Sequence, residues 1–161
     1  MDAAAPSIDP LLPIEHFVPH RGTMSLLSRL VAVDAEQALA EVDITPGSQF
    51  AQDQGVPAWV GIEYMAQTIA AWSGARARSA GGEPAIGFLL GSRRYQAEVP
   101  VFAVGQTLRI RTRCELIGES GLGQFECHIH GAADRLLAQA MVSVFEPPVP
   151  PSSATSPSCE A

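Results

Sequence analysis

The chain has 161 residues, a length that suits one domain with a substantial core. Its ten basic residues are all arginines, and seventeen acidic residues give a net charge of −7, which argues against general nucleic-acid binding. Glu63 and Gln67 interrupt the longest apolar stretch, and the first residues lack the positive charge of a secretory signal. We therefore expect a cytoplasmic protein whose partners include neither nucleic acid nor a membrane.

Cysteines and histidines do not form a recognisable metal motif. Cys114, Cys127 and Cys159 lack CxxC or CxxH spacing, so we interpret them as free thiols. His128 and His130 project to the same side of a predicted strand, but no cysteine or carboxylate completes a site. We expect these histidines to be sheet-face residues, and we expect no metal and no cofactor.

The chain predicts two strands, one long helix and four further strands. The strands 24–33 and 37–45 are joined by a turn at 34–36. Pro57 is predicted to open a helix that runs to about Ser79, where Gly81 and Gly82 stop it. The four later strands are expected at 86–99, 106–118, 123–131 and 136–145.

Domain limits follow from composition. The region 1–146 contains every predicted element and is expected to form a single domain. The tail 147–161 is rich in proline and serine and poor in apolar residues, so it is predicted to be disordered.

The predicted helix is apolar all round from Trp59 to Trp72, which is typical of a buried helix. A lone long helix among antiparallel strands is best covered by the sheet wrapped around it. Its small residues Ala66, Ala70 and Ala71 allow close approach by a strand, a partner subunit or an acyl chain.

Glu63 is a carboxylate within this otherwise apolar segment. Burial disfavours its charged form and favours the neutral acid, the state that a proton donor requires. Gln67 lies one turn further on, so the two groups either flank a reacting molecule or bond to each other. A structural alternative is a glutamate that reaches the rim or an arginine partner.

His20 lies in the segment FVPHRGTMSLL, between Pro19 and Gly22, which restrain its backbone. Histidine is the common general base because its ordinary pKa lies near neutrality. A loop histidine that serves only as a structural hydrogen-bonding group is the alternative.

Three motifs in order, PHRGTMSLLSRL, VPAWVGIEYMAQTIAAW and IGFLLGSRRYQAEVPVFAVGQTLRI, resemble the hotdog-fold 3-hydroxyacyl-[acyl-carrier-protein] dehydratases. The similarity is greatest to the branch associated with aryl polyene biosynthesis and covers about residues 12–146. It implies an α+β hotdog fold, in which a six-stranded antiparallel sheet wraps around one long central helix. It also implies a homodimer, or a heterodimer with another hotdog subunit, with active sites at the interface. The substrate would be a 3-hydroxyacyl chain on an acyl carrier protein.

The resemblance assigns site residues one by one. Glu63 matches the family's helical catalytic carboxylate, whereas Gln49 stands where the family has its catalytic histidine. His20 matches a further family histidine, and we hypothesise that it takes the vacant catalytic role. The helix start at Ala58 and Trp59 is expected to polarise the thioester carbonyl through its N–H groups. We expect four residues to contact substrate: Gln49, Ala58, Trp59 and Gln67.

Three functions remain open at this point: a dehydratase, a catalytically silent subunit of a heterodimeric dehydratase, and an acyl thioesterase. The Gln49 substitution favours the silent subunit, and a shared fold does not determine chemistry. Arg93 and Arg94 are candidate docking residues for an acidic carrier protein. Arg109, Arg111 and Arg113 share one face of a later strand and are expected to belong to the same basic strip, with a solvated outer face as the alternative.

Overall fold

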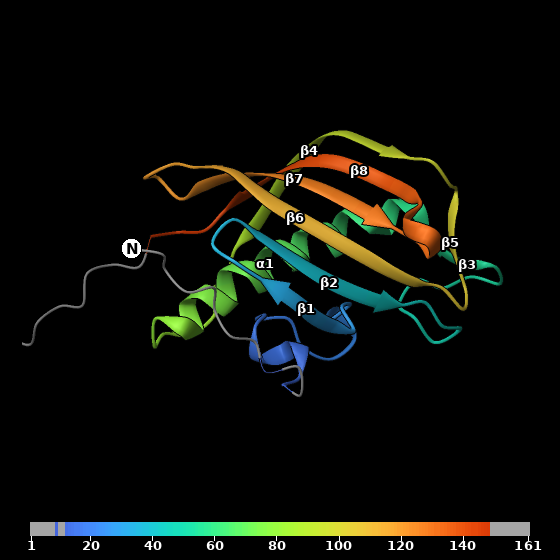
Figure 1. Cartoon of the computed structure of the whole chain (residues 1–161), viewed down its shortest axis with the longest axis horizontal. Helices are drawn as coiled ribbons and strands as arrows, with labels where there is room; N and C mark the ends of the chain where they lie inside the picture. Colours follow the sequence, from blue (N-terminus) through green and yellow to red (C-terminus); the bar gives the residue numbers. More distant parts are fainter. Residues whose placement is uncertain (1–8, 10–11, 149–161) are drawn as a thin grey trace, which may run out of the picture.

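The structure is a computed structural model that describes Asp9 and residues 12–148. Six strands form one antiparallel sheet around a central helix (Figure 1). The elements are η1 (Ile14–His16), η2 (Gly22–Met24), β1 (Arg29–Val33), β2 (Gln37–Asp43), β3 (Gly55–Pro57), η3 (Ala58–Val60), α1 (Gly61–Ser79), β4 (Phe88–Ala97), β5 (Val101–Ala103), β6 (Thr107–Ile117), β7 (Leu122–His130), η4 (Ala132–Asp134) and β8 (Leu136–Phe145).

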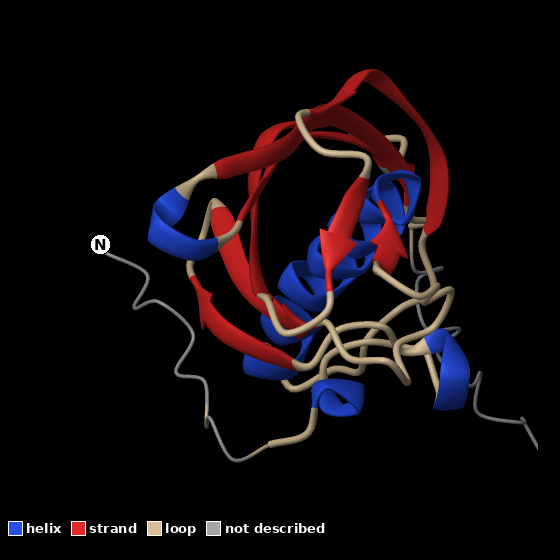
Figure 2. Ribbon diagram, turned by 90° about the vertical axis from the view of Figure 1, so that its right-hand side faces the viewer, coloured by secondary structure: helices blue, strands red, loops and turns tan. Residues whose placement is uncertain are grey.

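The strand order in the main sheet is β1-β2-β6-β7-β8-β4, and every neighbouring pair is antiparallel. The sheet curls so that its concave face encloses α1 (Figure 2). The predicted hotdog arrangement of one buried helix inside a six-stranded sheet is confirmed. Because β1 and β4 lie at the two ends of the order, they are the free edges of the sheet.

Alternation of side chains explains how the sheet holds the helix. In β6, Leu108, Ile110 and Thr112 are buried, whereas the intervening arginines are exposed. In β2, Ala38 and Ala40 are buried on the same side, and their small size allows α1 to lie close to the sheet.

The helix α1 has 19 residues and buries side chains over most of its circumference. Trp72 is 3% exposed, and its Nε1 donates to the Asp34 carbonyl at 3.1 Å, which ties the helix to the β1–β2 turn. A Cβ at Gly74 would collide with the carbonyl of Phe17, so this position needs glycine for the N-terminal segment to cross the helix. The buried carboxylate-bearing helix is therefore held from both sides.

One strand boundary and one strand pairing differ from the sequence prediction. The first strand begins at Arg29 rather than at residue 24, because Met24 and Leu26 use their backbone groups to bind Gln67. Pro57 is the N-cap of η3, which continues without a break into α1, so the predicted start of the helical segment is confirmed. Pro57 also ends β3, which pairs with β5 in a second, two-stranded sheet that was not predicted. The single turn η3 then leads into α1 at Gly61.

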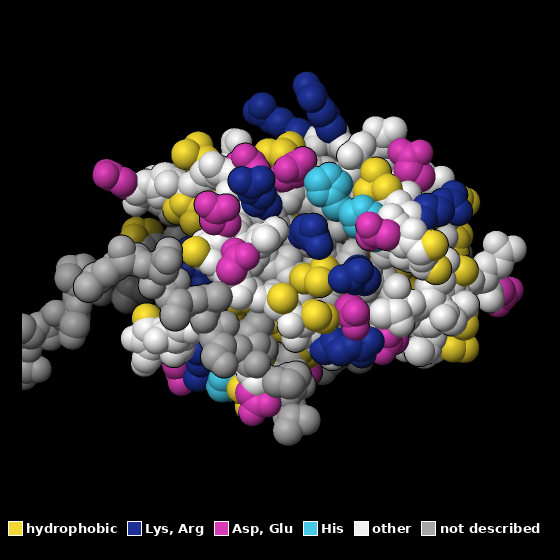
Figure 3. All heavy atoms as spheres, viewed as in Figure 1, with side chains coloured by type: hydrophobic (Ala, Val, Ile, Leu, Met, Phe, Trp, Pro, Cys, Tyr) yellow, Lys and Arg dark blue, Asp and Glu magenta, His cyan; other side chains and the backbone are white. Residues whose placement is uncertain are grey.

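The five arginines of the predicted basic strip are not continuous on the sheet. The β6 arginines and the β4 arginines are separated by β7 and β8, so they form two groups. Arg113 is further occupied by Glu36 and Glu115, at 3.7 and 3.9 Å. Arginines and acidic side chains are interspersed over the outer sheet face (Figure 3).

Three other predictions concern a metal site, a membrane-spanning helix and the C-terminal tail. Within residues 12–148 and Asp9, no group of three His, Cys, Asp or Glu could hold a metal ion, and the His128 and His130 rings lie 6.1 Å apart on the sheet. No helix in this described part combines the length and apolar character that crossing a membrane requires. Of the predicted disordered tail 147–161, the part from residue 149 onward, with Cys159, lies outside the described residues.

Candidate active site

Glu63 and His20 line the same pocket, which has a volume of about 230 Å³ and is called the Glu63 pocket below. Its walls come from the segment before η2, one face of α1, the start of β4 and the end of β8. The lining is mostly apolar and includes Ala66, Ala70, Phe88, Leu89 and Phe145. The two sequence candidates for acid and base therefore meet in one apolar pocket.

Gln67 holds Glu63 in place. Its side chain is fully buried, and its Nε2 donates to Glu63 Oε1 at 3.0 Å and to the Met24 carbonyl at 2.8 Å. Its Oε1 accepts from the Leu26 N–H at 2.9 Å. This amide is occupied by the chain itself, so the prediction that Gln67 contacts substrate is replaced by a positioning role. Of the two arrangements expected for Glu63 and Gln67, the structure shows the direct hydrogen bond.

His20 is half-buried, and burial is the largest influence on it, lowering the pKa of its imidazole below the ordinary 6.5. The nearby Glu63 carboxylate raises this pKa, and the Arg21 guanidinium lowers it. Burial thus favours the neutral imidazole, the form that can accept a proton. Its Nδ1 is buried with no hydrogen-bond partner in the described chain, so a bound molecule or partner subunit is free to supply one.

Gln49 does not join this pair. It lines a different pocket of about 210 Å³, together with Thr23, Ser25, Ser48 and Tyr64. Gln49 and Glu63, which are fourteen residues apart in the sequence, therefore line separate pockets of the same chain.

The helix start is arranged differently from expectation. The Ala58 N–H donates to the Pro100 carbonyl at 3.0 Å, so it is not available to polarise a thioester in this chain. The Ala58 carbonyl accepts a bond from the Tyr95 hydroxyl, and burial raises the pKa of the Tyr95 phenol to about 12, which keeps it a donor. Trp59 is 62% exposed and lies 5.6 Å from the ring of Phe50, away from the Glu63 pocket.

An exposed apolar edge adjoins the Glu63 pocket. Strand β4 is the last strand of the sheet, and Phe88 and Leu90 are 53% and 58% exposed. Ile86, just before this strand, is 64% exposed. Because Phe88 and Leu89 also line the pocket, whatever covers this edge would also wall the pocket. Arg93 and Arg94 are exposed further along the same strand.

Comparison with known proteins identifies this architecture. A family model described as "ApeP-like: ApeP dehydratase" matches residues 12–155. The chain is similar to a solved structure, the dehydratase heterocomplex ApeI:P from Xenorhabdus doucetiae. Identity to it is 29%, the match covers 85% of this chain and 92% of that one, and the TM-score is 0.79.

More distant solved structures share the fold. A hypothetical thioesterase with coenzyme A from Streptococcus pneumoniae is 14% identical, with a TM-score of 0.55 and coverage of 73% of this chain and 83% of that one. The E. coli PaaI protein is also 14% identical, with a TM-score of 0.57 and coverage of 73% and 77%. No curated protein sequence gives a significant match.

Proposed function

The chain belongs to the ApeP-like dehydratase family, and from this premise we propose that it dehydrates 3-hydroxyacyl thioesters carried by an acyl carrier protein, in aryl polyene biosynthesis. The supporting observation is that Glu63 and His20 line one apolar pocket on a dehydratase-family chain. A proton acceptor and a proton donor on either side of one bound molecule are what the elimination of water requires.

In the proposed reaction, neutral His20 removes the proton from the carbon next to the thioester carbonyl. Glu63 donates a proton to the departing 3-hydroxyl group, which leaves as water. The electrons of the broken C–H bond form the double bond of the 2-enoyl thioester. Transfer of the proton from His20 back to Glu63, directly or through water, restores both groups.

The pocket contributes in two further ways. Gln67 orients Glu63 through the 3.0 Å bond to Oε1, leaving the other carboxyl oxygen to serve the substrate. Apolar walls exclude water, which strengthens electrostatic interactions with the charge that develops on the thioester. A donor for that carbonyl oxygen is not supplied by Ala58, so we assign it to another backbone group or to the partner.

We further propose that the active form is a dimer with a second hotdog subunit, either another copy or a related chain. The heterocomplex of the similar ApeI:P supports a heterodimer. The unpaired β4 edge, with its exposed apolar side chains beside the Glu63 pocket, is the surface that fits such a partner.

A second candidate is a silent subunit that supports an active partner. The observation that favours it is the placement of Gln49, which cannot act as a base and lies outside the Glu63 pocket. In this reading, the pocket of Gln49 is an inactive counterpart of a site in the partner.

Product analysis tests the proposal. Purified chain, alone and mixed with candidate hotdog partners, is incubated with a 3-hydroxyacyl carrier protein, and the thioester is analysed by mass spectrometry. Loss of one water that depends on Glu63 supports the dehydratase. Water loss that needs the partner and survives Glu63→Gln supports the silent subunit, and a free acid supports a thioesterase.

The interface is tested separately by charge introduction. Ile86→Glu with Leu90→Glu should convert the dimer to a monomer in sedimentation analysis, because two buried carboxylates would disrupt an apolar edge. Val31→Glu is the matched control, since Val31 is 44% exposed on β1 at the opposite edge. An unchanged dimer in the first variant, or dissociation by the second, would place the interface elsewhere.

A further inference from the structure

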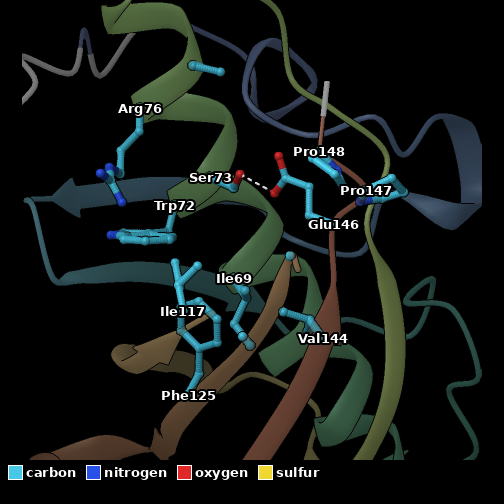
Figure 4. Close-up of a pocket in the computed structure, with 13 residues that line it drawn as sticks. Ile69, Trp72, Ser73, Arg76, Ile117, Phe125, Val144, Glu146, Pro147 and Pro148 are labelled. Atoms are coloured by element: carbon cyan, nitrogen blue, oxygen red, sulfur yellow. Dashed lines mark hydrogen bonds between the residues drawn. The ribbon is translucent and has the colours of Figure 1, made fainter. Parts of the chain in front are cut away.

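A second pocket lies beyond the Glu63 pocket, along the same helix. It has a volume of about 430 Å³ and is called the Trp72 pocket here (Figure 4). Its wall includes Trp72, Ile117 and Phe125, and the Trp72 and Phe125 rings meet edge to face at 5.4 Å. The Arg76 guanidinium lies over the Trp72 ring, 4.5 Å from its centroid. The interior is thus largely aromatic and aliphatic, with a charge at one side.

The two pockets are neighbours. Four residues line both of them: Ile69, Ser73, Val144 and Glu146. Ser73 and Glu146 also bond to each other, with the serine Oγ donating to Glu146 Oε2 at 2.7 Å (Figure 4). This bond links α1 to the residue that follows β8, so it joins opposite walls at the boundary between the pockets.

The helix α1 gives the distance from Glu63 to the boundary between the two pockets. Glu63 and Ser73 are ten residues apart on one helix, which corresponds to roughly 15 Å along its axis. An acyl chain whose reacting carbons lie at Glu63 would reach the Ser73–Glu146 bond only if its extended length approached this distance. Shorter chains would end within the Glu63 pocket.

We propose that the Trp72 pocket binds the far, apolar end of long acyl chains, and that the Ser73–Glu146 bond is the gate they must pass. This inference rests on the proposed function for the position of the reacting carbons. It adds a selection by length: short chains use only the Glu63 pocket, whereas long chains also use the Trp72 pocket.

The activity test compares kcat/KM for two sets of 3-hydroxyacyl carrier proteins. In one set the extended acyl chain is shorter than half of the roughly 15 Å between Glu63 and Ser73, and in the other it is longer than this distance. Ala77→Leu narrows the Trp72 pocket, because Ala77 lines this pocket and not the other. Exclusion of about two methylenes should lower kcat/KM for long chains about tenfold and leave short chains within about twofold. Ala80→Leu, at the exposed end of the helix, is the matched control and should change neither value.

The gate is tested by a second pair of variants. Ser73→Ala removes the bond and should raise the ratio of kcat/KM for long chains to that for short chains several-fold. Glu146→Gln keeps an amide oxygen that can accept from Ser73 and should keep the wild-type ratio. Equal effects on both chain lengths, or no effect of Ala77→Leu on long chains, would overturn the inference.

A binding measurement keeps the inference testable if the proposed reaction fails. The chain has two tryptophans, so Trp59→Phe leaves Trp72 as the single tryptophan, whose emission is excited selectively at wavelengths that tyrosine does not absorb. Long-chain fatty acids should shift the Trp72 emission and short-chain ones should not, and Ala77→Leu should weaken the response. A missing response to long chains would refute the pocket assignment, whereas a response without any dehydration would refute only the proposed function.

Discussion

Replacement of Glu63 by glutamine tests the proposed acid most directly. Glutamine has nearly the same size, and its side-chain oxygen can accept the bond that Gln67 Nε2 now donates at 3.0 Å. The three bonds of Gln67 are therefore retained, and the change removes only the transferable proton. We expect the free energy of unfolding to stay within about 0.5 kcal/mol of the wild type.

The expected kinetic loss is large. General acid catalysis usually contributes about 10²–10⁴ in rate, which corresponds to about 2.7–5.4 kcal/mol of transition-state stabilisation. The kcat for formation of the enoyl thioester should fall by this factor in Glu63→Gln, measured by absorbance or by mass spectrometry of the carrier protein. KM should change little, because the pocket walls are intact.

Glu98→Gln is the matched control. Glu98 also accepts a bond from a glutamine amide, from Gln96 at 3.1 Å, but it lies outside the Glu63 pocket. Its kcat should equal that of the wild type. If Glu63→Gln retained wild-type kcat, Glu63 would not be the acid, whatever the pocket geometry.

The role of His20 as the base is tested by a double-mutant comparison. If His20 is the base, His20→Ala should lower kcat about as much as Glu63→Gln, and the double variant should lose little more than either single variant. A rate that survives His20→Ala but not Glu63→Gln would show that no base acts at His20.

Three further predictions concern the surroundings of this pair. In the pH profile of kcat/KM, the acidic limb should lie below pH 6.5, because burial lowers the pKa of His20. Arg21→Gln removes a cation that lowers this pKa further, so the limb should move to higher pH. Gln67→Leu should lower the free energy of unfolding by roughly 1–3 kcal/mol in urea melts, since it leaves two half-buried backbone groups unpaired. Arg93→Glu with Arg94→Glu should weaken binding of the acidic carrier protein, most strongly at low salt, in titration calorimetry.

Each of these has a control and a contrary outcome. Arg21→Lys keeps the charge, so a limb that moves equally in both variants would point to the Arg21 hydrogen bonds to Val18 and His20 instead. An unfolding free energy within about 0.5 kcal/mol of the wild type in Gln67→Leu would show that water replaces the amide. Carrier binding that falls equally with Arg111→Glu, on the outer face of β6, would indicate a general charge effect.

The secondary structure was largely readable from local pattern. The all-round apolar character of 59–72 predicted a buried helix, and Gly81 lies just beyond its observed end at Ser79. Alternation in 107–113 predicted a strand with arginines outside and apolar residues inside, as observed. Both signals depend only on side-chain direction along one element, which has a constant period in a helix or strand.

The prediction failed where a distant residue competes for the backbone. Residues 24–28 have the composition of a strand, but the Gln67 amide, about 40 positions away, captures the Met24 carbonyl and the Leu26 N–H. Pro57 precedes the helical segment, as its local signature predicts, but its pairing with Val101 also ends a short strand that was not predicted. Nothing in the neighbouring residues encodes such long-range partners.

The sequence by itself determined that Glu63 lies on a buried helix and that Gln67 shares its face. Only the tertiary structure decided that His20 joins Glu63 in one pocket, that Gln49 lines another, and that Glu146 reaches Ser73. These three outcomes depend on how far the sheet curls and on where the loops cross the helix. Such features are set by the packing of many side chains together, because a pocket is the space that distant elements leave between them, and no single stretch of sequence specifies it.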